Sequence, residues 1–134
     1  MSNPAEAYGK TAKMAGGNPR DLEATLLIRA ASQLQKIKDD WPDTPSDLDP
    51  ALLYNRKLWT IFAASAAEAD HPLPRDIKQN IANLAVFIFK QTAEIMLKPA
   101  PEKLDTLINI NRQIAAGLYE AGGQTTDTAA HSAT

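Results

Sequence analysis

The stretch LPRDIKQNIANLAVFIFKQTAEIMLKPAPEKL, residues 73–104, decides the fold. Pro74 stands near its start, and the next prolines are Pro99 and Pro101. Proline fits the first turn of a helix, where its missing N–H has no partner to lose, but it costs about 3 kcal/mol in a helix interior. The residues between these prolines therefore predict one long helix. The side chains that recur at helical spacing along it are Ile77, Ile81, Leu84, Ala85, Ile88, Thr92 and Ile95.

The same punctuation recurs along the chain. Asn18 and Pro19 read as the N-cap and first residue of a helix, Asp49 and Pro50 repeat the pattern, and Pro101 opens a last helix. Apolar residues recur at helical spacing in the first and last of these segments as well. No run alternates with a period of two between turn signals, so we expect no sheet.

Short connections make consecutive helices antiparallel neighbours. The longest predicted connection is DDWPDTPSDLD, residues 39–49, and the others are tight. The sequence therefore predicts an all-α fold: a bundle of four main antiparallel helices, preceded by a short helix around residues 5–14. We expect one domain over residues 1–120. Residues 121–134 have the composition of a disordered tail.

Composition excludes several classes of function. With 14 basic and 16 acidic residues the net charge is −2, which argues against a dedicated nucleic-acid-binding protein. The absence of cysteine excludes disulfides and thiolate metal sites. The longest apolar run, residues 84–89, is far shorter than the roughly 20 residues of a membrane span. The first ten residues lack the apolar segment of a secretory signal, so we expect a soluble, cytoplasmic protein with no membrane partner.

Two asparagine–arginine pairs interrupt apolar helix faces. Asn55 has Trp59 among its helical neighbours, and Asn111 lies among equally apolar ones. In one interpretation each amide bonds a loop backbone or the other asparagine and fixes the helix register. In the other, the asparagines line a groove and bind the backbone of a partner. Arg56 and Arg112 lie one step round the helix, where they can snorkel or pair with an acid such as Asp105 or Glu102.

Large apolar residues on polar helix faces are candidates for partner binding. Phe87 leans out of the apolar stripe, and Val86 and Phe89 broaden the apolar surface of the same helix. The structural alternative is a central helix that packs on several sides. Trp41 is either a loop lid over the core or an exposed anchor. The candidate partner-binding residues are Asn55, Arg56, Trp59, Val86, Phe87, Phe89, Asn111 and Arg112.

The sequence shows no catalytic or metal-binding constellation. His71 lies in a proline-rich loop and His131 near the end of the chain, and we expect both to be exposed to solvent. Neither has the convergent ligands of a metal or acid–base site. We therefore expect no cofactor, no metal and no enzymatic activity.

Five segments resemble the FlaF family of flagellar biosynthesis regulators. They are residues 7–12, 19–34, 51–62, 71–89 and 104–118. The most specific elements are the NR-LW pattern that begins at Asn55 and the INR-IA-GL pattern around Asn111.

The resemblance implies a small helical, non-enzymatic protein of flagellated α-proteobacteria, required for flagellin production and filament assembly. Family members act opposite FlbT, which holds back translation of flagellin mRNA, and direct association with flagellin in the manner of an export chaperone is attributed to them. Flagellin and FlbT are thus the expected partners. The alternative is a post-transcriptional regulator of flagellin mRNA that acts through FlbT or directly on RNA. Direct RNA binding fits poorly with the net charge of −2.

Overall fold

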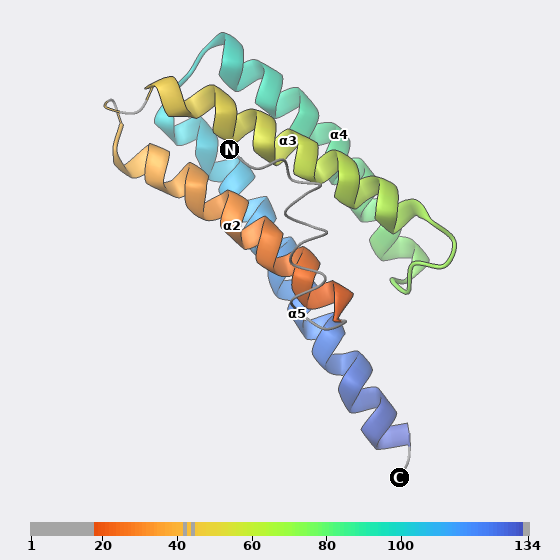
Figure 1. Ribbon diagram of the computed structural model, residues 1–134. Helices are drawn as coiled ribbons and strands as arrows, with labels where there is room; N and C mark the ends of the chain where they lie inside the picture. Colours follow the sequence, from red (N-terminus) through yellow and green to blue (C-terminus); the bar gives the residue numbers. More distant parts are fainter. Residues whose placement is uncertain (1–17, 42, 44, 133–134) are drawn as a thin grey trace.

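Four long helices make up the computed structural model, which describes residues 18–41, 43 and 45–132 (Figure 1). No strand occurs among these residues, so the predicted all-α class is confirmed. The short helix expected around residues 5–14 lies outside the described residues. The elements are α2 (Pro19–Asp39), α3 (Pro45–Ala67), α4 (Arg75–Leu97), a 3-10 turn η1 (Pro101–Lys103) and α5 (Leu104–Ser132).

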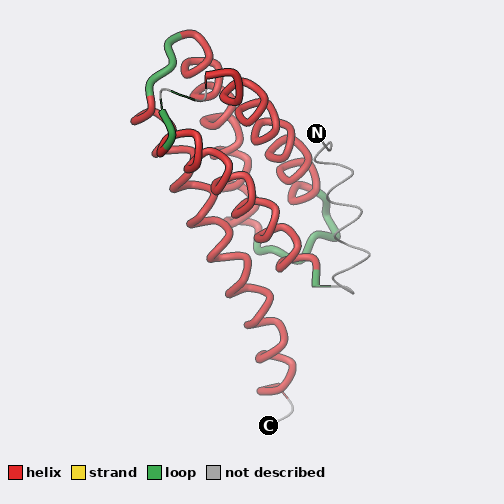
Figure 2. The backbone as a smooth tube through the Cα atoms, turned by 60° about the vertical axis from the view of Figure 1, so that its left-hand side comes forward, coloured by secondary structure: helices red, strands yellow, loops and turns green. Residues whose placement is uncertain are grey.

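The helices pack as two antiparallel pairs, α2 with α5 and α3 with α4, and α2 also packs against α3 (Figures 1 and 2). Although α4 and α5 are consecutive, they make few contacts with each other. Because α4 and α5 do not pack closely against each other, a groove remains between them, and the candidate site lies in that groove.

The beginning of α2 follows the sequence prediction. Asn18 is the N-cap, and its side-chain oxygen accepts a hydrogen bond from the backbone N–H of Asp21 at 3.3 Å. Pro19 occupies the first helical position, where it sacrifices no hydrogen bond. The cap satisfies one of the four backbone donors that every helix N-terminus leaves free.

The beginning of α3 differs from the prediction. The helix starts at Pro45 rather than at Pro50, which lies inside it. Pro50 cannot donate to the carbonyl of Ser46, but Ser46 is exposed, so water can take that place. The earlier start reduces the expected eleven-residue loop to residues 40–44.

At the other end of that loop, Trp41 is half-buried and packs against the core, as expected of a lid rather than an exposed anchor.

The last two helices begin close to the predicted prolines. Pro74 is the N-cap of α4, so the helix itself begins at Arg75. Pro101 opens η1, which leads directly into α5. Beyond Ala121, where composition predicted a disordered tail, the backbone of α5 continues as helix to Ser132. Extending an existing helix fixes one residue for each hydrogen bond gained, whereas starting a helix is costly.

One side of each helix supplies the core. Along α4 the buried residues Ile81, Ala85, Ile88, Thr92 and Ile95 reproduce the predicted stripe, with the Thr92 hydroxyl donating to the carbonyl of Ile88 at 2.6 Å. Ile77 was predicted to belong to the same stripe but is 41% exposed. The prediction was wrong there because α5 does not close over the first turn of α4.

Candidate partner-binding groove

The two asparagines meet in the middle of the bundle. Asn111 donates from its side-chain nitrogen to the Oδ1 atom of Asn55 at 2.7 Å and to the backbone carbonyl of Leu27 at 3.2 Å. The Oδ1 atom of Asn111 accepts a hydrogen bond from the indole N–H of Trp59 at 2.8 Å. Asn55, Trp59 and Asn111 are all 0% exposed, and this asparagine cluster joins α2, α3 and α5.

This geometry confirms the interpretation in which each asparagine amide bonds the other. Asn111 uses its donor group twice and its acceptor once, so it is the hub of the cluster. The side-chain nitrogen of Asn55 has no acceptor among the described residues. Contact of these three side chains with a partner stays a prediction, and it would require the helices to separate.

The arginines that follow the asparagines lie on the surface. Arg56 and Arg112 are both exposed. Asp105, one of the acids expected to pair with them, instead forms an ion pair with Lys38 at 2.5 Å. A role for either arginine in partner binding stays a prediction.

Phe87 lies on a different side of α4 from Val86 and Phe89, which are three residues apart and neighbour each other on the helix surface. Val86 is 52% exposed and Phe87 is 43% exposed, while Phe89 is half-buried against the core. Consecutive helical residues are about 100° apart, so Val86 and Phe87 flank the buried stripe on opposite sides. Phe87 follows Asn80 by seven residues and therefore shares its face. The three residues cannot form a single anchor.

A groove of about 400 Å³ separates the first turns of α4 from the last packed turns of α5. Its walls are mainly apolar, and Leu73 in the α3–α4 loop lies at the start of the α4 wall. The lining residues are Leu73, Pro74, Ile77, Asn80, Ile81, Gln113, Ile114, Gly117, Leu118, Glu120 and Ala121.

Gly117 widens the groove on the α5 side. A Cβ atom built on Gly117 would meet no atom within 4 Å, so the space beside its backbone is open. Asn80, Gln113 and Glu120 are the exposed polar residues of the lining. The groove could not be recognised from the sequence because Ile77 and Ile114 fit the core periodicity. A possible signal was Gly117, a residue without a side chain next to the apolar stripe of α5.

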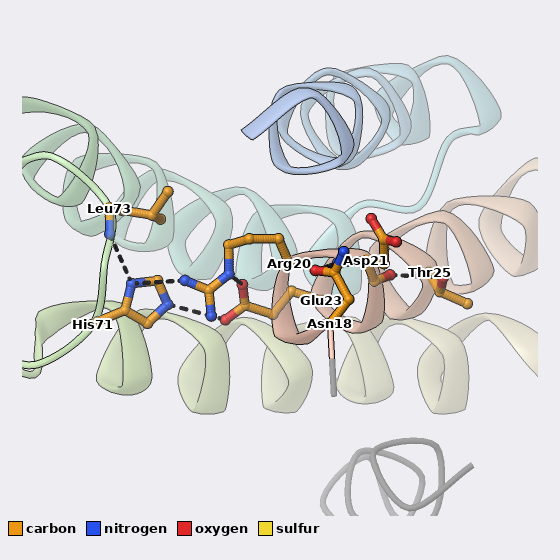
Figure 3. A network of polar contacts seen from close by, with 7 residues as sticks. All are labelled: Asn18, Arg20, Asp21, Glu23, Thr25, His71 and Leu73. Carbon is orange, nitrogen blue, oxygen red and sulfur yellow. Dashed lines mark hydrogen bonds and ion pairs between the residues drawn. The ribbon is translucent and has the colours of Figure 1, made fainter. Parts of the chain in front are cut away.

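A second polar cluster attaches the α3–α4 loop to the first turns of α2 (Figure 3). The Nε atom of Arg20 lies 2.7 Å from Oε1 of Glu23, and the Nε2 atom of His71 lies 3.2 Å from Oε2 of the same carboxylate. Arg20 also contacts the Nδ1 atom of His71 at 3.3 Å. The exposed fractions are 8% for Arg20, 2% for Glu23 and 9% for His71.

The expectation that His71 is exposed was therefore wrong. Its loop folds back on α2, because Glu23 lies among apolar neighbours such as Leu26 and Leu27 and needs polar partners there. Glu23 on an apolar stripe, with Arg20 three residues before it, was the signal in the sequence. The exposure of the His131 side chain lies outside what the structure describes.

The partners of His71 define its tautomer. Arg20 can only donate, and the backbone N–H of Leu73, 3.4 Å from Nδ1, can only donate as well. Nδ1 is therefore the acceptor, and Nε2 carries the proton that is donated to Glu23. Every polar atom of the imidazole is used, so His71 links α2 to the residue that begins the groove lining.

No group of His, Asp or Glu side chains among the described residues is arranged to hold a metal ion. No helix among them combines the length and apolar character that crossing a bilayer requires.

Fold and groove together define a small helical bundle with an apolar groove between α4 and α5. Comparison with known families gives a more specific result: the model of the flagellar protein FlaF family matches residues 4–118. The chain belongs to the FlaF family, as the sequence resemblance predicted. Neither the curated proteins nor the solved structures gave a significant match.

Proposed function

We propose that this protein binds monomeric flagellin in the cytoplasm and promotes its synthesis and export, acting opposite FlbT. It works by binding and performs no catalysis. Membership of the FlaF family supports a flagellar role. The observation that carries the binding mode is the apolar groove between α4 and α5.

An amphipathic helix is the occupant that fits this groove. Such a helix inserts apolar side chains at positions i, i+3, i+4 and i+7 into a groove between helices, while its polar face stays in water. Ile77, Ile81, Ile114 and Leu118 supply facing apolar walls, and Gly117 leaves room for one large side chain. The terminal segments of flagellin are amphipathic before they polymerise, which makes them suitable ligands.

Phe87 can extend the binding surface beyond the groove. It lies two turns after the lining residue Asn80 on the same face of α4 and is 43% exposed. Exposed aromatic residues beside an apolar groove commonly contribute much of the binding energy. Val86 lies on the other side of the buried stripe of α4. It is similarly exposed but does not share a face with Asn80.

The test is calorimetric titration of monomeric flagellin into the parent protein and into two tryptophan variants. Gly117→Trp fills the groove with a side chain that the open space accommodates. Ala116→Trp adds the same ring at an exposed position one residue away. We expect flagellin affinity to fall on the order of 10-fold or more for Gly117→Trp and to stay near the parent value for Ala116→Trp. Failure of the parent to bind flagellin, alone or with FlbT present, would exclude the proposal.

A parallel titration with the leader RNA of flagellin mRNA addresses the alternative function. Binding of RNA without binding of flagellin would favour direct post-transcriptional regulation. If a titration with FlbT shows binding while those with flagellin and RNA do not, regulation through FlbT would be favoured.

A further inference from the structure

We propose that Arg20, Glu23 and His71 form a latch that holds the groove in its open, preformed shape. The latch ties the α3–α4 loop to α2 and so fixes Leu73 and the first turn of α4, against which a partner helix packs. The identity of that partner rests on the proposed function, but the latch itself does not. His71 is a positioning residue in this proposal.

The first step of the argument is burial. Three ionisable side chains are buried together at one end of the bundle, and His71 is 51 positions from Arg20 and 48 from Glu23 in sequence. Buried polar groups are costly unless they are paired, and here the ion pair of Arg20 with Glu23 and the contacts of His71 with both residues specify one position of the loop.

The second step is the connection to the groove. The Nδ1 atom of His71 accepts a hydrogen bond from the backbone N–H of Leu73. The Leu73 residue is 9% exposed and lines the groove. Pro74 and Ile77 follow within one turn and line it as well. Moving His71 away from Glu23 would therefore displace the end of the α4 wall.

The third step is that the other polar contacts of the loop are local, so that apolar packing of Leu73 is its remaining tie to the core. Between Ala67 and Arg75 the backbone forms turn hydrogen bonds, such as the one from the N–H of His71 to the carbonyl of Glu68 at 3.1 Å. The ammonium group of Lys78 donates to the same carbonyl at 2.6 Å. These bonds stay within the loop and its flanking helices. Among the described residues of this loop, His71 makes polar contacts that reach α2 (Figure 3).

Two substitutions of His71 test separately its hydrogen bond to Glu23 and its hydrogen bond from the Leu73 backbone. His71→Asn places an acceptor near the Nδ1 position and loses the donor to Glu23, whereas His71→Gln retains the donor and loses the acceptor. We expect exchange of the Leu73 amide proton, followed by NMR, to become on the order of 10-fold faster in His71→Gln, which loses the acceptor for that proton, and to accelerate as well in His71→Asn, because the hydrogen bond that ties the loop to Glu23 is lost. Leu73 exchange at the parent rate in His71→Gln would overturn the proposal.

Groove shape can be measured without any partner. The chain has no cysteine, so spin labels can be attached specifically to Arg75→Cys on α4 and Ala116→Cys on α5, both exposed positions. We expect one narrow distance distribution in the otherwise unaltered chain and a broader one when His71→Gln is added. A distribution that stays narrow would overturn the proposal. Glu23→Gln, which keeps the size of the side chain, provides a second variant should His71→Gln fail to fold.

Flagellin titration then separates the two proposals. If the parent binds flagellin, His71→Gln should bind about 10-fold more weakly because the groove is no longer preformed. Equal binding alongside a broadened distance distribution would show that the latch does not serve this partner, and would overturn its assigned role. If the parent does not bind flagellin, the proposed function fails, while the distance and exchange measurements still decide whether the latch exists.

Discussion

Two buried polar clusters hold this bundle together in different ways. The asparagine cluster is neutral, lies at the centre and joins helices to one another. The latch contains an ion pair, lies at one end and joins a loop to a helix. A central neutral cluster fixes how helices align, whereas a charged cluster at the end fixes where a loop rests. We therefore expect changes at the centre to reduce global stability and changes at the end to alter the groove.

The largest effect should come from Trp59→Ala. The ring is 0% exposed, packs edge-on against Phe62 with centroids 5.4 Å apart, and donates to Asn111. Its removal should cost about 3–5 kcal/mol in free energy of unfolding, a large part of the stability of a small domain. Chemical denaturation measures this cost. A variant that unfolds like the parent but no longer binds flagellin would place Trp59 on the binding surface instead.

Glu23→Ala should come next, at roughly 2–3 kcal/mol. Breaking a buried ion pair usually costs about 3–5 kcal/mol because a charge is left unpaired. Arg20 lies in the first turn of α2 and can turn outward to water, so the cost should be lower. Thermal unfolding gives the stability, and spin-label distances show whether the loop has moved. A loss of stability with no change in distance would contradict the expected difference between the two clusters.

Asn111→Ala and Asn55→Ala compare the two halves of the asparagine cluster. Loss of Asn111 leaves the Trp59 indole N–H without its acceptor and should cost about 1–3 kcal/mol. Loss of Asn55 should cost less, because Asn55 makes one hydrogen bond and already has an unpaired donor. Urea unfolding of both variants tests the order. Equal costs would show that Asn111 is not the hub.

The smallest stability effects belong to the exposed pair on α4. Val86→Asp and Phe87→Asp should each change the free energy of unfolding by no more than about 0.5 kcal/mol, since both side chains are substantially exposed. We expect Phe87→Asp to weaken flagellin binding by about 1–3 kcal/mol and Val86→Asp to leave it unchanged. Thermal melting and calorimetric titration provide the two readouts. Equal effects on binding would show that the surface extends round α4.

The asparagine cluster could be anticipated from sequence, whereas for the latch the sequence indicates only that Glu23 needs polar partners and not that His71 is one of them. Asn55 and Asn111 stand on helical faces whose neighbours are all apolar, so periodicity alone requires partners for them inside the bundle. The partner of Glu23 comes from a loop almost fifty residues away, and loop position follows no periodicity. The groove was hidden for a related reason. Periodicity identifies the apolar face of each helix, but it does not show which faces remain uncovered.

The length of α5 has a hydrodynamic consequence. Its 29 residues correspond to about 44 Å, against about 32 Å for the 21 residues of α2. The last turns of α5 therefore project beyond the packed bundle (Figure 1). A particle of this outline experiences more friction than a sphere of 14.5 kDa, so a single copy should elute early from a sizing column. Oligomeric state and flagellin complexes are therefore better measured by light scattering or sedimentation equilibrium, which report mass independently of shape.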